Sequence, residues 1–274
     1  MAQSAIKNVL SIAGVDPSGG AGVLADIKSM SAMGVYAAGV VAALTAQNTQ
    51  RVTGVFAVPA SFVREQIDTL FSDVRIDAVK IGMLGDPAVV ETVAERLRFW
   101  KPRWIVIDPV MVAKSGDSLV GKETVAAIVR EMLPISQIMT PNLPEASVLL
   151  GREIRDVNQM RDAARDLFTL SGNHCSVLLK GGHLTDEVCS DLFFDGKDFT
   201  ELTSERIHTK NTHGTGCALS SAIAASLAKS NDPLQAVREG KDFITAAICA
   251  SDALDVGSGH GPVNHFTGLW KEVR

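Results

Sequence analysis

The chain has 274 residues, of which 46% are hydrophobic and 21% are charged, and its formal net charge is −5 at pH 7. This composition provides enough apolar residues for a large core and argues against disorder. The negative charge argues against a nucleic-acid partner, which would require a basic surface.

No apolar run reaches the roughly 18 residues that a membrane span requires, so we expect no membrane partner. Met1–Lys7 lacks the basic and apolar segments of a secretory signal. The cysteines are scattered without a CxxC pair, which favours free thiols over a zinc site or a disulfide framework. We therefore expect a cytoplasmic protein.

Predicted strands alternate with predicted helices along the chain. Strands are expected at Asn8–Ala13, Val40–Leu44, Val52–Val58, Ala78–Ile81, Trp104–Ile107, Gln137–Met139 and Ser176–Leu179. Helices are expected at Leu24–Met33, Ala60–Phe71, Pro87–Phe99, Lys122–Leu133, Val157–Leu170, Thr215–Ala228 and Pro233–Ala253. A polar loop is expected at Thr45–Gln50 and a β-hairpin at Asp191–Leu202.

This alternation predicts an α/β fold with a mainly parallel sheet covered on both faces. We find no repeat or linker, and we expect one domain over residues 1–274. Ligands of such sheets bind at the carboxyl ends of the strands. Polar or glycine-rich groups follow several predicted strands there: Gly14, Gly82, Asp108, Asn142, Glu145, Lys180 and the 211–217 turn.

The turn Asn-Thr-His-Gly-Thr-Gly-Cys at 211–217 leads into a helix of small residues. A helix start leaves backbone N–H groups unpaired and carries a positive dipole end, a combination that binds phosphate. Cys217 in the first helical turn is expected to have a lowered thiol pKa and to serve as a base. The alternative is a buried, inert cysteine.

Two nucleotide-binding motifs are incomplete or missing. Gly20-Ala-Gly22-Val-Leu-Ala25 matches a dinucleotide fingerprint, but Val40–Ala46 contains no acidic residue for the ribose. The chain also lacks a P-loop sequence. A nicotinamide enzyme and a P-loop enzyme are therefore both disfavoured.

Asp108 and Glu145 follow predicted strands and are candidate ligands for Mg²⁺, which needs one or two carboxylates besides phosphates and water. An N-cap role for Asp108 and a first-turn role for Glu145 are the alternatives. Lys180 could meet a phosphate or simply face solvent. Gln47 carries both donor and acceptor groups, which suits a neutral heterocycle with an amino group.

These motifs, in this order, resemble the ribokinase superfamily, and within it the hydroxymethylpyrimidine kinase/phosphomethylpyrimidine kinase family of thiamine biosynthesis. The resemblance covers nearly the whole chain, and its motifs lie at 13–22, 43–49, 80–84 (Lys-Ile-Gly-Met-Leu), 108–111 (Asp-Pro-Val-Met), 140–145 (Thr-Pro-Asn-Leu-Pro-Glu), 179–183 (Leu-Lys-Gly-Gly-His), 211–217 and 259–266.

The resemblance implies a three-layer αβα, ribokinase-like fold, a homodimer, and two successive ATP-dependent phosphoryl transfers with Mg²⁺. It leaves open whether a monovalent cation assists. The implied substrates are a small pyrimidine alcohol, its monophosphate, and ATP.

The resemblance also implies roles for individual residues. Gln47 would pair with the amino group and ring nitrogen of the pyrimidine, and Asp26 would lie at its hydroxymethyl side. The pyrimidine would be walled by Gly14, Met83 and Val110.

The remaining implied roles concern the phosphates and the metal. The anion hole would consist of Gly214, Thr215, Gly216 and Cys217, with Cys217 taking the hydroxyl proton. Mg²⁺ would be organised by Asp108, Glu145 and Asn142, and ATP would be contacted by Lys180, Thr212 and Lys241.

Most superfamily members carry Asp where Cys217 stands. Cysteine fits the pyrimidine kinases, but it also fits a subgroup of pyridoxal kinases on the same scaffold. A pyridoxal kinase therefore remains an alternative, as does a nucleotide-binding regulator without turnover.

Overall fold

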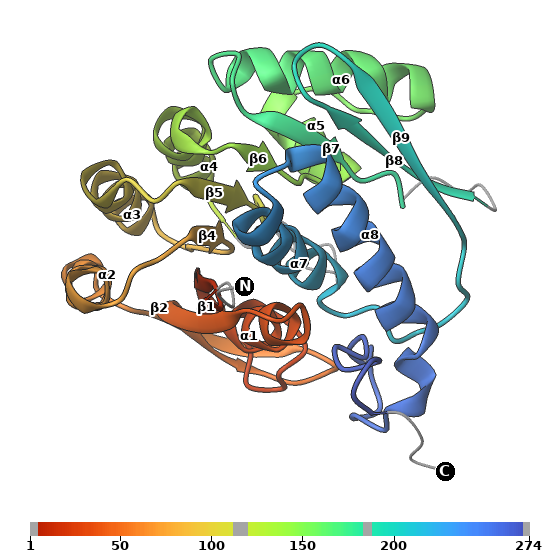
Figure 1. The fold of residues 1–274 in the computed structure, drawn as a ribbon, viewed down its shortest axis with the longest axis horizontal. Helices are drawn as coiled ribbons and strands as arrows, with labels where there is room; N and C mark the ends of the chain where they lie inside the picture. The colour runs from red at the N-terminus through yellow and green to blue at the C-terminus, as the bar shows by residue number, and fades with distance from the viewer. Residues whose placement is uncertain (1–4, 112–119, 183–187, 271–274) are drawn as a thin grey trace.

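A computed structural model describes residues 5–111, 120–182 and 188–270. Its strands form one nine-stranded sheet in the order β3-β2-β1-β4-β5-β6-β7-β8-β9 (Figure 1). The strands are β1 (Asn8–Val15), β2 (Tyr36–Gln47), β3 (Val52–Ala57), β4 (Ala78–Ile81), β5 (Trp104–Ile107), β6 (Ile138–Met139), β7 (Ser176–Leu179), β8 (Val188–Phe194) and β9 (Phe199–Glu205).

The strands from β2 to β7 in this order pair in parallel, whereas β3 at one edge and β8 and β9 at the other pair antiparallel. The sheet is therefore mainly parallel, as predicted. The central strands are almost wholly buried because helices cover both faces.

Two groups of helices cover the two faces of the sheet. One face carries α1 (Gly22–Ala32), α7 (Thr215–Ser230) and α8 (Pro233–Cys249). The other carries α2 (Ala60–Asp73), α3 (Pro87–Trp100), α4 (Lys122–Ala127), α5 (Leu143–Leu150) and α6 (Val157–Leu170). This arrangement confirms the predicted three-layer α/β fold.

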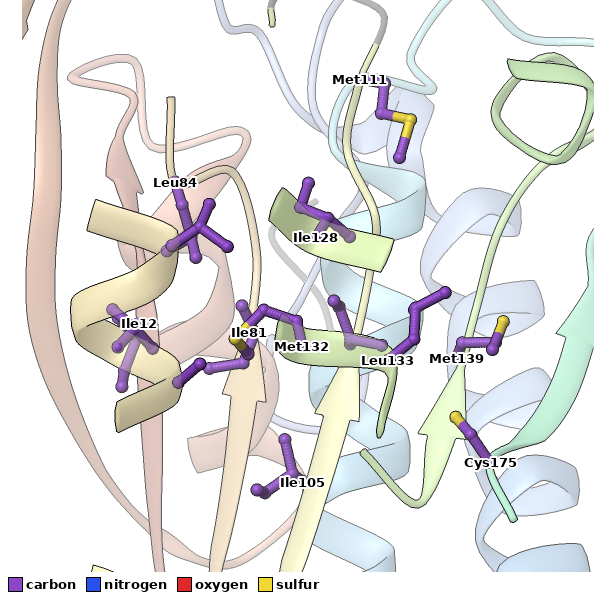
Figure 2. Packing of buried hydrophobic residues seen from close by; sticks show 14 of the residues in the cluster. Ile12, Ile81, Leu84, Ile105, Met111, Ile128, Met132, Leu133, Met139 and Cys175 are labelled. Atoms are coloured by element: carbon purple, nitrogen blue, oxygen red, sulfur yellow. The ribbon is translucent and has the colours of Figure 1, made fainter. Parts of the chain in front are cut away.

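The core on the second face shows how the layers join. Ile12, Ile81 and Ile105 project from three neighbouring strands toward Met132 and Leu133 (Figure 2). Because these side chains are at most 3% exposed, the sheet and its helices bury one continuous apolar layer between them.

Several predicted boundaries are wrong. Residues 45–47 continue β2 instead of starting a loop, because β2 and β3 form an antiparallel hairpin in which Gln47 pairs with Val52. The predicted 122–133 helix changes to a π-helical turn at Ile128–Met132 and a 3-10 turn at Leu133–Ile135. Pro134 lies in that last turn, where its missing N–H cannot continue the helical ladder.

Two further differences concern helices near the site and at the end of the chain. The sequence pattern missed α5, whose eight residues are too few for a clear helical period. The last long helix ends at Cys249, four residues earlier than Ala253, and a 3-10 turn follows. His183, at the end of one motif, lies outside the described residues.

Within the described part of the chain, no helix has the length and apolar character to cross a membrane.

Candidate active site

A cavity of about 1400 Å³ lies along the carboxyl edge of the parallel strands. It extends from the β2–β3 pair to the β8–β9 pair, since residues of all four strands line it. Every predicted site residue except Asp26 lines this cavity: Gly14, Gln47, Met83, Asp108, Val110, Asn142, Glu145, Lys180, Thr212, Gly214, Thr215, Gly216, Cys217 and Lys241.

The start of α7 is a glycine-dependent turn. Gly214 caps the helix with φ 75°, and a Cβ there would lie 1.7 Å from the backbone oxygen of Gly20. A Cβ on Gly216 would lie 3.1 Å from Lys180 Nζ and 3.4 Å from an Asp108 oxygen. The first amides of a helix have no partner within it. The Thr215 N–H bonds back to the Thr212 oxygen at 3.4 Å, and the turn brings the next amides of α7 close to Lys180 and Asp108.

Cys217 lies where two helices begin. The backbone N–H of Gly22, the first residue of α1, lies close enough to the thiol to lower its pKa, and Cys217 itself is in the first turn of α7. The positive ends of both helix dipoles therefore lie near the sulfur.

Burial nevertheless raises the pKa of the Cys217 thiol to about 11. The charge of Lys80 and the Gly22 amide oppose this rise, whereas Asp26 and Asp108 add to it. The lowered pKa expected from the helix start is therefore wrong, because desolvation outweighs the dipole and the nearby lysine. In the unliganded protein the group is a neutral thiol at pH 7.

Asp26 has a different role from the predicted one. Its carboxylate is completely buried and accepts hydrogen bonds from Lys80 Nζ at 2.8 Å, from the Ser11 hydroxyl at 2.5 Å and from the Ser221 hydroxyl at 2.8 Å. These three partners are fully buried, and Asp26 itself does not line the cavity. Its expected contact with a substrate hydroxymethyl group is replaced by a buried ion pair.

Lys80 is a site residue that was not predicted from the sequence. Burial alone would lower the pKa of the Lys80 ammonium, but the nearby charges, chiefly that of Asp26, and the hydrogen bond to Asp26 together outweigh burial and raise it, so the group stays charged. Lys80 also lines the cavity, whereas its partner does not. A lysine within the apolar strand Ala-Val-Lys-Ile was the available signal, because an unpaired buried lysine is strongly disfavoured.

Asp108 and Lys180 form a second ion pair at the strand ends. Lys180 Nζ lies 3.0 Å from Asp108 Oδ1, which also accepts a hydrogen bond from the Thr140 hydroxyl at 3.0 Å. Burial would lower the pKa of Lys180, but the charges of Asp108 and Glu145 raise it above its usual value. A fixed ammonium group therefore faces the cavity at neutral pH.

Glu145 and Asn142 together cap α5. The Asn142 side chain accepts from the Glu145 N–H and the Glu145 carboxylate accepts from the Asn142 N–H, each at 2.8 Å. Burial raises the pKa of Glu145 to about 7; Lys180 opposes that shift, and the like charge of Asp108 adds to it. The predicted metal ligands Asn142 and Glu145 thus have a structural role in the first turn of a helix.

The donor set still suits a divalent cation bound jointly with phosphates. In the described ranges, no group of three or more His, Cys, Asp or Glu side chains could hold a metal. Asp108 and Glu145 provide two buried carboxylates on one cavity, balanced there by Lys180. Mg²⁺ commonly binds to one or two carboxylates together with phosphate oxygens and water.

The end of the cavity at β2 contains a polar group against an apolar wall. Gln47 ends β2, and its side-chain nitrogen lies 3.5 Å from His213 Nε2, which is 2.7 Å from Asp16 Oδ2. Gly14 and Met83 belong to the apolar wall and lie close to each other, because a Cβ on Gly14 would lie 2.8 Å from the methyl carbon of Met83. The sequence reading did not select Asp16, although it lies in the Gly-Val-Asp-Pro turn.

The opposite end of the cavity contains Lys241 of α8. Lys241 Nζ lies 2.7 Å from Asp191 Oδ2 of β8, and Asp191 also accepts from the Gly181 N–H at 2.9 Å. A third lysine is thus fixed by a carboxylate, and Thr212 lines the same cavity.

The buried pair of Asp26 and Lys80 should dominate local stability. Asp26→Asn leaves a buried ammonium without its counter-charge, and we expect it to lower the free energy of unfolding by about 3–5 kcal/mol. Removing both charges in Asp26→Asn/Lys80→Met should cost less than the sum of the single changes. Urea denaturation of the four proteins measures this coupling.

Glu95→Gln provides the control, because it breaks the exposed ion pair with Arg64 and should cost at most about 1 kcal/mol. An Asp26→Asn cost as small as that of Glu95→Gln would contradict the assignment.

The family model described as phosphomethylpyrimidine kinase matches residues 16–264. The chain is 48% identical over 263 residues to a hydroxymethylpyrimidine/phosphomethylpyrimidine kinase of Rhizobium meliloti strain 1021, covering 96% of this chain and 98% of that protein. The structure of Staphylococcus aureus pyridoxal kinase in complex with AMP-PCP and pyridoxal is similar with a TM-score of 0.88 at 30% identity, covering 97% of this chain and 96% of that one. Phosphomethylpyrimidine kinase from Clostridium difficile 630 has a TM-score of 0.78 at 37% identity, covering 88% of this chain and 99% of that one. The chain belongs to the phosphomethylpyrimidine kinase family.

Proposed function

We propose that this protein transfers the γ-phosphoryl group of ATP to 4-amino-5-hydroxymethyl-2-methylpyrimidine and then phosphorylates the resulting monophosphate to the diphosphate used in thiamine biosynthesis. The observation that carries the proposal is the amide-rich start of α7, which lies on one cavity between the Gln47 end and the Lys241 end. The Rhizobium meliloti relative is named for both phosphorylations, which supports the same pair of reactions here.

The lysines and the helix start suit the phosphates of ATP. Lys180 and Lys241 line the cavity, and the pKa of Lys180 is raised, so its positive charge persists at neutral pH. Thr212 lies just before the turn that supplies the amides. The Staphylococcus aureus neighbour was solved with AMP-PCP, an ATP analogue, which supports ATP as the co-substrate.

Asp108 and Glu145 would hold Mg²⁺, with Asn142 supporting Glu145 through the helix cap. The metal would supply positive charge to the phosphate oxygens as negative charge shifts during transfer.

In phosphoryl transfer, the protein mainly positions groups and stabilises charge. The amides of Gly214, Thr215, Gly216 and Cys217 would donate hydrogen bonds to the migrating phosphoryl group. A single preorganised donor of this kind contributes about 3–4 kcal/mol to the transition state. Cys217 would accept the proton of the attacking hydroxyl, which requires its thiolate form.

Gln47 would select the pyrimidine. Its carboxamide can accept from the exocyclic amino group and donate to the adjacent ring nitrogen, while Gly14, Met83 and Val110 wall the ring. Pyridoxal has no amino group next to the carbon that bears its hydroxymethyl group. It would leave part of the carboxamide unpaired, and such a mismatch is penalised strongly in a closed site.

A single kinase domain, a homodimer and a cytoplasmic location stay predictions. The resemblance implies the homodimer, whereas the single domain is expected because the sequence has no repeat or linker, and the cytoplasmic location because its cysteines are scattered. The two predicted alternatives can be told apart from this proposal by their products. A pyridoxal kinase would form a pyridoxal phosphate, and a non-catalytic regulator would form no product.

A competition assay with both alcohols tests the substrate. We expect kcat/KM for the pyrimidine to exceed that for pyridoxal by about a hundredfold or more, because only the pyrimidine satisfies both groups of Gln47. Gln47→Met, which keeps the length but removes the polar groups, should bring the two values together. Product mass would identify the mono- and diphosphate, and binding without any product would support the regulator instead.

The pH dependence tests Cys217 as the base. Because its pKa is raised to about 11 and the proposed active form is the thiolate, kcat/KM should rise by about tenfold per pH unit between pH 7 and 9. Cys217→Asp should flatten this rise, since an aspartate is already ionised there. Cys217→Ala should lower kcat by about 10²–10⁴-fold. A flat wild-type profile, or full activity in Cys217→Ala, would rule out the proposed base.

A further inference from the structure

The side chain of Asp16 is held as an ionised acceptor at the Gln47 end of the cavity. It is 3% exposed and accepts from the Ser18 N–H and hydroxyl, each at 2.9 Å, and from the Ala21 N–H at 3.1 Å. Burial would raise the pKa of Asp16, but the hydrogen bonds from His213 and Ser18 outweigh burial and lower it. At neutral pH the carboxylate can therefore only accept hydrogen bonds.

This acceptor determines which nitrogen of His213 carries hydrogen. His213 Nε2 lies 2.7 Å from Asp16 Oδ2, so Nε2 must donate. The ring is also confined, because a Cβ on Gly20 would lie 2.4 Å from His213 Cδ2. The backbone N–H of His213 donates to the backbone oxygen of Gly261 at 3.0 Å, which fixes the backbone from which the ring extends.

The neighbours of Gln47 then assign its carboxamide. Gln47 Nε2 lies 3.5 Å from His213 Nε2, whose one hydrogen is donated to Asp16, so two donor nitrogens lie side by side and neither accepts from the other. On the other side, Thr45 Oγ1 has one hydrogen for two acceptors, Gln47 Oε1 at 3.2 Å and the Val15 carbonyl at 2.9 Å, and we assign the hydrogen to the shorter contact. Two acceptors therefore face each other there.

One rotation of the Gln47 carboxamide by 180° corrects both mismatches. The oxygen then lies 3.5 Å from the His213 Nε2 donor, whose partial positive charge favours an oxygen over an NH₂ group there, and the nitrogen donates to Thr45. Carboxamide oxygen and nitrogen have nearly the same shape, so hydrogen-bond partners are the proper basis for assigning them.

The assigned orientation determines how the pyrimidine would lie. Around its ring follow the hydroxymethyl group, the amino group, a ring nitrogen and the methyl group. An oxygen of Gln47 on the His213 side pairs with the amino group there and leaves the hydroxymethyl group on that same side. His213 directly precedes the 214–217 turn, so the hydroxyl is directed toward the amides and Cys217. The opposite carboxamide orientation would direct it toward Thr45.

We propose that Asp16 and His213 are positioning residues that fix the carboxamide of Gln47 and thereby select the productive orientation of the pyrimidine ring. The inference rests on the proposed function and adds to it a basis for substrate orientation.

Asp16→Asn tests the hydrogen-bond direction. The new side chain can donate to His213 Nε2, which moves the ring hydrogen to Nδ1 and makes Nε2 an acceptor. Gln47 and the pyrimidine then reverse together, so substrate still binds but its hydroxyl is misdirected. We expect kcat to fall by about tenfold or more while KM changes by less than about threefold. An unchanged kcat would overturn the proposal.

Two His213 variants distinguish the effect of the N–H donor from the effect of ring packing. This test does not require that Asp16→Asn folds. His213→Phe keeps a planar ring without a donor and should lower kcat by about tenfold. His213→Gln restores an N–H near the same place and should return kcat to within about threefold of the wild type. Equal losses in both variants would show that only packing matters and would overturn the proposal.

Nitrogen-15 NMR of the imidazole provides a readout that needs no turnover. We expect the Nε2–H form in the wild type and the Nδ1–H form in Asp16→Asn. A wild-type Nδ1–H form would overturn the proposal. A wild type that phosphorylates pyridoxal but no pyrimidine would contradict the proposed function instead. In that case the NMR result alone would show whether Asp16 fixes the hydrogen of His213 on Nε2.

Discussion

The buried ion pair of Asp26 and Lys80 is the contact on which the geometry of the site depends. Asp26 belongs to α1 and Lys80 to β4, and the Ser221 hydroxyl of α7 donates to the same carboxylate. One helical turn earlier on each helix, the N–H of Gly22 meets the sulfur of Cys217. The two helices are thereby joined in register at two successive turns, and both begin at the cavity.

The same arrangement recurs across the cavity. Three of the lysines that line it are each paired with an aspartate from a neighbouring element: Lys80 with Asp26 at 2.8 Å, Lys180 with Asp108 at 3.0 Å, and Lys241 with Asp191 at 2.7 Å. Flexible side chains are thus fixed before any ligand arrives. Fixed charges and amides stabilise a transition state without the cost of reorganising during the reaction, which suits the transfer of a phosphoryl group.

Groups at the ends of predicted strands could be located from the sequence. Asp108 and Lys180 follow apolar strands of a parallel sheet, so topology alone brings them to one edge. The roles of Asp26 and Cys217 could not be read in this way. Asp26 meets Lys80 across 54 positions of sequence, and the sign of the Cys217 pKa shift depends on how much burial α1 and the sheet impose. Both are consequences of tertiary packing, which no local pattern contains. The capping role of Asn142 could have been predicted from the sequence, since Asn followed three residues later by Glu is a capping-box pattern.

The central claim is that the joined starts of α1 and α7 form the place where the phosphoryl group is transferred. The most direct test is a crystal structure with ADP, Mg²⁺ and beryllium trifluoride, which imitates that group. The account predicts fluorine atoms within about 3 Å of the backbone nitrogens of residues 214–217, beside the sulfur of Cys217. A trifluoride group bound elsewhere in the cavity, with these amides left to water, would contradict it.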